Sequence, residues 1–238
     1  MKCIGFSTGA LARNDFRRAL QMLSNKDVSA VELSALRQNE LAPLVEQLGQ
    51  LKLDGFQYIS FHAPSAIEPA FEPMALELLQ QVAARSWPII VHPDAMHNPG
   101  RWASLGDCLC IENMDKRKPT GQTAKSLAEI FQLLPNAFLC FDIGHARQVD
   151  PTMSEAWTIL QLFHNRIKQL HVSEVNSQSR HDRLSIESVL AFKRVSHLLP
   201  ADVPIILESR VEEAEINEEI QSALDALNPA TQLAIASD

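Results

Sequence analysis

The stretch "FLCFDIGH" at residues 138 to 145 joins an apolar run to two polar side chains. Four apolar residues lead directly into Asp142, and His145 follows three positions later. A short continuous apolar run of this kind is typical of a strand that is buried on both faces of a parallel sheet. Because a carboxylate is costly to move from water into an apolar interior, this strand end predicts a partner for Asp142.

Similar runs occur along the whole chain and set the expected number of strands. The eight β-branched or apolar runs cover residues 3–7, 28–34, 58–63, 88–93, 108–113, 138–142, 167–173 and 204–209. Segments with apolar residues at helical spacing lie between them, which predicts alternating strands and helices and hence a parallel sheet. Eight such units in 238 residues fit a single (β/α)₈ barrel with parallel strands, whose usual size is about 250 residues.

A doubly wound open sheet is the alternative architecture. Its dinucleotide-binding form is disfavoured, because the first strand continues as "GFSTGALAR" (5–13), without the G-x-G-x-x-G spacing. No low-complexity linker or charge block divides the chain. We therefore expect one domain over residues 1–238, of which residues 228–238 form a terminal tail.

The amino-acid composition limits which classes of function the protein can have. The formal net charge of −8 argues against a nucleic-acid partner and favours small-molecule chemistry. The four cysteines lie in apolar runs without a C-x-x-C pair, which indicates reduced core thiols. The chain opens without the pattern of a secretory leader, and no apolar run approaches the ~20 residues that span a bilayer. We expect a soluble cytoplasmic protein without a membrane partner, either monomeric or a homo-oligomer.

Polar residues of metal-binding type stand at the ends of six consecutive runs. They are His62, His92, Glu112, Asp142, His171 and Glu208. Barrel active sites lie at the carboxyl ends of the strands, so the six side chains are expected on one face of the barrel. A single histidine after an apolar run is usually a satisfied structural residue, whereas six in register indicate a site.

The two-residue period of a strand extends this prediction into the barrel interior. If Glu112 faces inward, Cys110 and Cys108 share that face, and Cys140 does so with Asp142. In the seventh run, inward His171 brings Gln169 to the same face. That set is less apolar than a barrel core, which suggests a short strand or a solvated lower part.

Three imidazoles and three carboxylates at one barrel mouth are suited to a divalent metal ion. Carboxylate oxygen and neutral imidazole nitrogen bind Zn²⁺, Mn²⁺, Fe²⁺ or Co²⁺, and the lack of a thiolate set argues against a closed structural zinc site. Such a cation would offset the cost of burying Asp142.

The ordered motifs resemble those of the xylose-isomerase-like TIM barrels. That group includes sugar isomerases and epimerases of the tagatose 3-epimerase type and the DNA-repair enzyme endonuclease IV. The resemblance covers residues 58 to 210 and rests on "FHAP" (61–64), "VHPD" (91–94), "IEN" (111–113), "FDIGHA" (141–146), "LHVSE" (170–174) and "ILES" (206–209).

The resemblance implies specific roles in the sugar-converting branch. The metal ligands would be Glu112, Asp142, His171 and Glu208. Glu112 and Glu208 would also remove and return a proton beside a carbonyl, through a metal-stabilised enediolate. The residues expected to contact substrate are His145, Arg180, His181, Asp182 and Arg183.

His62 and His92 resemble two histidines of the nuclease branch. In that branch the equivalent histidines hold a second metal together with the glutamate that corresponds to Glu112. The third metal of that branch needs a histidine two residues beyond Asp182, where this chain has Leu184, while His181 precedes the aspartate. This departure argues against a three-metal site and leaves open whether His181 or Asp182 binds metal.

The sequence thus supports three hypotheses of function. The leading one is a metal-dependent isomerase or epimerase acting on a small sugar, sugar phosphate or related keto compound. The first alternative is an endonuclease IV-like phosphodiesterase or nuclease, and the second is a barrel that binds a ligand without catalysis.

Overall fold

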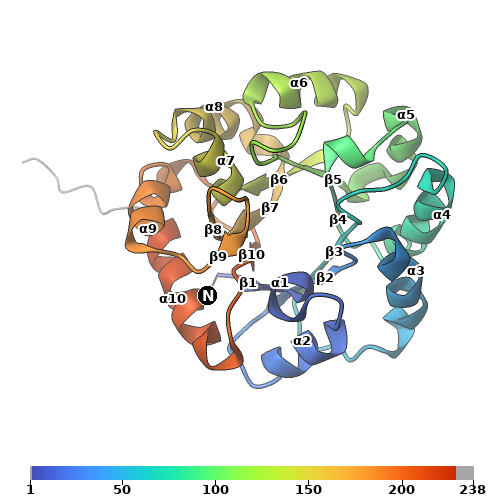
Figure 1. Cartoon of the computed structure of the whole chain (residues 1–238), viewed down its shortest axis with the longest axis horizontal. Coiled ribbons are helices and arrows are strands. Elements are labelled where there is room, and N and C mark those ends of the chain that lie inside the picture. The colour runs from blue at the N-terminus through green and yellow to red at the C-terminus, as the bar shows by residue number, and fades with distance from the viewer. Residues whose placement is uncertain (1, 229–238) are drawn as a thin grey trace, which may run out of the picture.

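Eight parallel strands close into a barrel, and helices surround it in a ring (Figure 1). This computed structural model describes residues 2–228, so most of the predicted tail, residues 229–238, lies outside the described residues. The order of hydrogen-bonded strands is β1-β10-β7-β6-β5-β4-β3-β2. The predicted (β/α)₈ barrel is therefore confirmed, and the open-sheet alternative is wrong.

Each of the eight predicted runs contains one barrel strand. The strands are β1 (Ile4–Ser7), β2 (Ala30–Ser34), β3 (Tyr58–His62), β4 (Ile89–Val91), β5 (Leu109–Glu112), β6 (Phe138–Asp142), β7 (Ile167–Val172) and β10 (Ile205–Leu207). A small antiparallel hairpin of β8 (Glu174–Val175) and β9 (His181–Asp182) follows β7. This hairpin rises from the loop that carries several of the predicted substrate contacts.

The helices follow the strands along the chain. They are α1 (Thr8–Ala12), α2 (Phe16–Leu23), α3 (Gln38–Gln47), α4 (Glu72–Ala83), α5 (Pro99–Trp102), α6 (Ala124–Leu133), α7 (Ile143–Val149), α8 (Ser154–Phe163), α9 (Ile186–Lys193) and α10 (Ile216–Leu227). Short 3₁₀ helices cover Leu48–Gln50, Pro93–Ala95, Ala103–Cys108, His164–Arg166, Ser196–Leu198 and Glu213–Glu215. No helix within residues 2–228 is long and apolar enough to cross a membrane.

Side-chain caps fix where several of these helices begin. Thr123 accepts a hydrogen bond from Ser126 N at the start of α6, and Ser185 caps α9 in the same way. Capping satisfies backbone N–H groups that have no partner inside the helix. Asp142 caps the start of α7 in the same way, by accepting a hydrogen bond from His145 N.

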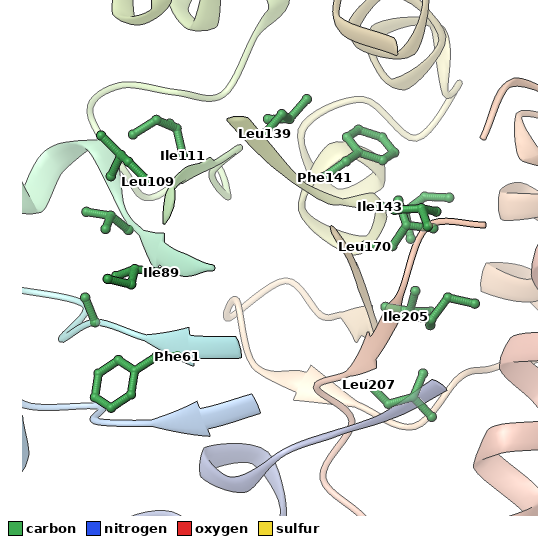
Figure 2. Close-up of a cluster of buried hydrophobic side chains, with 14 of the residues drawn as sticks. Phe61, Ile89, Leu109, Ile111, Leu139, Phe141, Ile143, Leu170, Ile205 and Leu207 are labelled. Atoms are coloured by element: carbon green, nitrogen blue, oxygen red, sulfur yellow. The ribbon is translucent and has the colours of Figure 1, made fainter. Parts of the chain in front are cut away.

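Alternate strand residues divide the core into two parts. One set packs between the strands and the helices, and it includes Phe61, Leu139, Phe141 and Leu207 (Figure 2). The other set fills the barrel interior, where Ile90, Cys110 and Cys140 form a small separate cluster. The two-residue period of a strand accounts for the division, because neighbouring side chains point to opposite faces.

The interior differs from the expectation at two positions. Gln169 is fully buried among other polar side chains, and water reaches β7 only at its first two residues, Ile167 and Lys168. Cys108 precedes β5 and lies on the helix side, with its thiol 3.7 Å from the carbonyl oxygen of Ala83. All four cysteines are free, as expected from the absence of a paired motif.

The closure of the barrel at β1 depends on the absence of a side chain at Gly5. A β-carbon there would lie 1.6 Å from the carbonyl oxygen of Ala30, its register partner on β2. We expect Gly5→Ala to lower the free energy of unfolding by more than about 4 kcal/mol, measured by urea denaturation, or to prevent folding. Gly55→Ala is the matched control, because nothing lies within 4 Å of the added atom. An equal effect of both substitutions would contradict this account.

Candidate metal centre

Four predicted ligands converge at the carboxyl-terminal mouth of the barrel. Glu112 ends β5, Asp142 ends β6, His171 lies on β7, and Glu208 directly follows β10. One ligand atom from each of the four lies within 4.8 Å of the corresponding atoms of the others. Parallel strands bring these residues together because every strand ends at the same rim.

Glu112 is the central carboxylate, and histidines surround it. Its Oε1 lies 3.2 Å from His171 Nδ1 and its Oε2 lies 3.2 Å from His62 Nε2. His92 Nε2 is 3.1 Å from Oε2, and His145 Nδ1 is 3.4 Å from Oε1. Burial alone would raise the pKa of Glu112, but the neighbouring histidines outweigh it and hold that pKa well below its usual range. Glu112 is therefore ionised.

Hydrogen bonds hold both the backbone and one side-chain oxygen of the buried Asp142. Asn113 donates from Nδ2 to Asp142 O and accepts from Asp142 N, both at 2.8 Å. The Oδ1 atom accepts from His145 N at 2.7 Å, which caps α7. The other oxygen, Oδ2, is buried and has no hydrogen-bond partner among the described residues, and its nearest cationic neighbour is His145 Nδ1 at 3.4 Å.

The environment of Asp142 disfavours its charge in the absence of a cation. Burial raises the pKa of Asp142 to about 6, and the nearby Glu112 carboxylate adds to the shift. An unpartnered oxygen that faces three other metal-type ligands is what a cation would satisfy. The donor set of three carboxylates and one imidazole therefore fits a divalent metal ion.

Glu208 is the most accessible of the four. Its side chain is 13% exposed and lies 3.7 Å from His171 Nδ1 and 3.3 Å from His181 Nδ1. Burial raises the pKa of Glu208 to about 7, and repulsion from Glu112 and Asp142 contributes. Glu112 and Glu208 thus have different proton affinities although they share one cavity.

A second cluster adjoins the first through a shared carboxylate. His62 and His92 both contact Glu112 Oε2, and their ring centroids are 5.0 Å apart. These three side chains also offer ligand atoms within 4.8 Å of one another. A second cation at this place is compatible with the donor set.

The cluster opens into a cavity of about 530 Å³. His145 and His181 line it together with the cationic residues Arg180 and Arg210. The cationic residues Arg117 and Lys118 also line it, and they pair with Asp115 and Asp94. Among residues 2–228, no carboxylate lies within 4.0 Å of the Arg180 or Arg210 guanidinium.

Two predicted substrate contacts lie elsewhere. Arg183 pairs with Glu215 at 2.7 Å and with Glu218 at 3.0 Å, because β9 directs it toward the acidic start of α10. Asp182 accepts a hydrogen bond from Asn176 Nδ2 at 2.6 Å and is exposed. Neither residue lines the cavity, so the cavity lining does not support their predicted contact with substrate.

One acidic residue in contact with the metal ligands was not among those expected from the sequence. Glu32, in the middle of β2, is fully buried and its Oε2 lies 3.0 Å from His171 Nε2. Burial by itself would raise the pKa of Glu32, but His171 reverses the shift and the pKa is lowered. A lone acid inside the apolar run "VSAVELS" was the available signal, since a charge inside a buried strand needs a partner.

Comparison with known proteins supports the same architecture. Residues 101–230, more than half of the chain, match the family described as xylose isomerase-like TIM barrel. No curated protein sequence matches the chain.

Three solved structures illustrate the likeness. A xylose isomerase domain protein from Alicyclobacillus acidocaldarius has a TM-score of 0.64 at 13% identity, over 95% of this chain and 97% of its own. The 3-keto-D-glucoside 4-epimerase from E. coli has a TM-score of 0.57 at 10% identity, over 95% and 99%. A candidate sugar phosphate isomerase/epimerase from Anabaena variabilis has a TM-score of 0.56 at 16% identity, over 92% and 88%. At these identities the likeness shows the fold alone.

The raised pKa of Asp142 generates a stability prediction for the metal-free protein. The folded state binds a proton more tightly than the unfolded state, so wild-type stability falls as pH rises from the unfolded pKa of 3.8 to about 6. At about pH 7.5 in excess EDTA, we expect Asp142→Asn to raise the free energy of unfolding by up to about 3 kcal/mol. Urea denaturation measures this difference.

Asp115→Asn is the control for this prediction and should have the opposite sign. Burial alone would raise the pKa of Asp115, but hydrogen bonds from Arg117 and Ser179 lower it to about 2. Removing that charge should therefore destabilise the protein near neutral pH. A destabilising Asp142→Asn would show that the Asp142 charge is already well compensated without a cation.

Proposed function

The chain belongs to the xylose isomerase-like TIM barrel family, and from this premise we propose that it is a metal-dependent isomerase or epimerase. The substrate would be a small sugar, a sugar phosphate or a related keto compound. The observation that carries the proposal is the convergence of Glu112, Asp142, His171 and Glu208 on one point of a polar cavity. Two of the similar solved structures are named as carbohydrate isomerases or epimerases, which agrees with the proposal.

Asp142, His171 and the two glutamates would hold the metal ion. When bound, a divalent ion supplies Lewis-acid polarisation of a substrate carbonyl. The protein's own side chains would bind the substrate and transfer the protons.

Glu208 is the best-suited group for proton transfer. Burial raises the pKa of Glu208 to about 7 in the metal-free site, and a bound cation would lower it, so Glu208 is the more basic of the two glutamates. Glu112 lies across the ligand cluster and is ionised, the form in which a carboxylate accepts a proton, although its histidine neighbours make it the weaker base of the two. An epimerase needs two such groups, since the proton leaves one face of the substrate carbon and returns to the other.

Other cavity residues would orient the substrate. His145 donates from Nδ1 to the Asn113 carbonyl oxygen at 2.9 Å, which leaves Nε2 available for a substrate oxygen. Arg180 and Arg210 line the cavity, and no carboxylate of residues 2–228 pairs with them, so they are suited to a phosphate or an array of hydroxyl groups. This arrangement favours a polar or anionic small molecule.

The second candidate function is that of a metal-dependent phosphodiesterase. The observation that favours it is the His62–His92–Glu112 cluster, which could hold a second cation beside the first. Two adjacent metal ions are the usual arrangement for phosphoryl transfer. The number of tightly held ions therefore separates the two candidates.

We expect the wild-type protein to retain one divalent ion per chain after exhaustive dialysis, as measured by elemental analysis. His62→Ala and His92→Ala should leave this count unchanged and mainly weaken substrate binding, because both side chains lie outside the four-ligand group. Two retained ions in the wild-type protein would support the phosphodiesterase instead. In that case each histidine substitution should remove about one ion, since losing one of few ligands removes most of the affinity.

Proton transfer by Glu208 can be measured directly in D₂O. With aldoses, ketoses, keto-glycosides and their phosphates, we expect the wild-type enzyme to exchange the hydrogen beside the carbonyl for deuterium, as followed by proton NMR. Glu208→Gln should slow this exchange by at least about 100-fold, because it removes the titrating group.

Two controls accompany this measurement. Arg183→Gln, which alters a residue outside the cavity, should leave the exchange rate within about twofold, as expected of a surface site. The metal content of Glu208→Gln separates loss of the proton-transfer group from loss of the ion. Exchange at the wild-type rate in a metal-loaded Glu208→Gln protein would reject the assigned role.

A further inference from the structure

A layer of buried polar side chains lies inside the barrel, directly beside His171. Glu32 of β2 and Gln169 of β7 are fully buried, as is Ser60 of β3. Buried polar groups of this kind destabilise the folded state unless they form hydrogen bonds. Their contacts therefore show which groups they stabilise.

One oxygen of Glu32 accepts hydrogen bonds from two neighbours in this layer. Its Oε2 accepts from Gln169 Nε2 at 2.7 Å and from Ser60 Oγ at 3.1 Å. The amide of Gln169 is oriented by Tyr58, whose hydroxyl donates to Gln169 Oε1 at 2.8 Å. Consequently the NH₂ group of Gln169, and not its carbonyl, faces Glu32.

His171 Nε2 is the third neighbour of the same oxygen, at 3.0 Å. It also lies 2.8 Å from Gln169 Nε2, because both nitrogens converge on Glu32 Oε2. Each ring nitrogen of His171 faces a carboxylate, Nε2 facing Glu32 and Nδ1 facing Glu112, so without a cation both nitrogens can carry a proton. A cation bound at Nδ1 would replace the proton there and leave the other on Nε2, where Glu32 Oε2 can accept it.

The opposite edge of the ring faces the proposed metal ligands. His171 Nδ1 lies 3.2 Å from Glu112 Oε1 and 3.7 Å from Glu208 Oε1. The contact between Nε2 and Glu32 thus leaves Nδ1 as the ring nitrogen that faces the ligand cluster. Such carboxylate–histidine–metal arrangements also make the imidazole a stronger ligand.

We propose that Glu32 is a positioning residue of the metal centre, which holds His171 in the Nε2–H tautomer with Nδ1 aimed at the ion. The proposal rests on the metal site of the proposed function, but not on the reaction or the substrate.

A purely structural role explains Glu32 less well. Its second oxygen, Oε1, is buried without a hydrogen-bond partner among the described residues, and an unsatisfied buried group destabilises the folded state. An apolar residue would fill the same space at lower cost. The carboxylate is instead placed where its charge acts on His171.

The test compares Zn²⁺ affinities, measured by competition with a chromophoric chelator. Glu32→Gln preserves shape while it removes the charge, and we expect it to raise the dissociation constant about 10- to 100-fold, the usual effect of losing a partner of a metal-bound histidine. Ser60→Ala is the matched control, because it removes a hydrogen bond to the same Glu32 oxygen without touching His171. We expect it to change the dissociation constant less than about threefold.

A second readout reports the tautomer itself. Long-range ¹H–¹⁵N spectra of the zinc-loaded wild-type protein should show His171 protonated at Nε2 and metal-bound at Nδ1. Metal binding through Nε2 would overturn the proposal, as would an affinity of Glu32→Gln within threefold of wild type. The thermal midpoint of each metal-free variant shows whether it is folded before zinc is added.

The outcomes also separate this inference from the proposed function. A wild-type protein that binds no zinc would remove the metal centre and the inference with it. Tight binding by both the wild type and Glu32→Gln would reject only the role of Glu32.

Discussion

The desolvation of three carboxylates at one end of the barrel is the constraint on which the rest of the site depends. Glu112 and Asp142 are almost fully buried, and Glu208 is only slightly exposed. Negative charges this close repel one another strongly once water is removed. The protein meets this cost unevenly: histidines surround Glu112, whereas burial leaves Asp142 and Glu208 with raised pKa values.

That uneven compensation gives each carboxylate a different chemical character. Glu112 stays ionised because both of its oxygens face imidazoles, so it suits a permanent ligand. Glu208 has fewer histidine neighbours and is the most exposed of the three, so its proton affinity is higher than that of Glu112. The difference arises from which strands flank each residue, since all three belong to the same rim.

The barrel interior supports the rim from within. Its β4–β6 side is filled by Ile90, Cys110 and Cys140, whereas the β7, β2 and β3 side carries the polar set around Glu32. A closed barrel allows this contact, because β10 and β1 separate β7 from β2 in the sheet while their inward side chains meet across the interior. The fold thus supplies both the ligands at its mouth and the residues that orient them.

The sequence by itself determined the eight strands, their parallel arrangement and the polar residues at their ends, because strand periodicity and apolar runs are local properties. Glu112, Asp142, His171 and Glu208 could be placed at one rim on that basis, since every parallel strand ends at the same edge. Only the tertiary structure decided that Glu32 meets His171 across 139 residues and that Arg183 turns to α10 and away from the cavity. It also decided that Gln169 is buried rather than solvated. These outcomes depend on contacts between strands and helices far apart in the chain and on the direction of individual side chains, which no local pattern encodes.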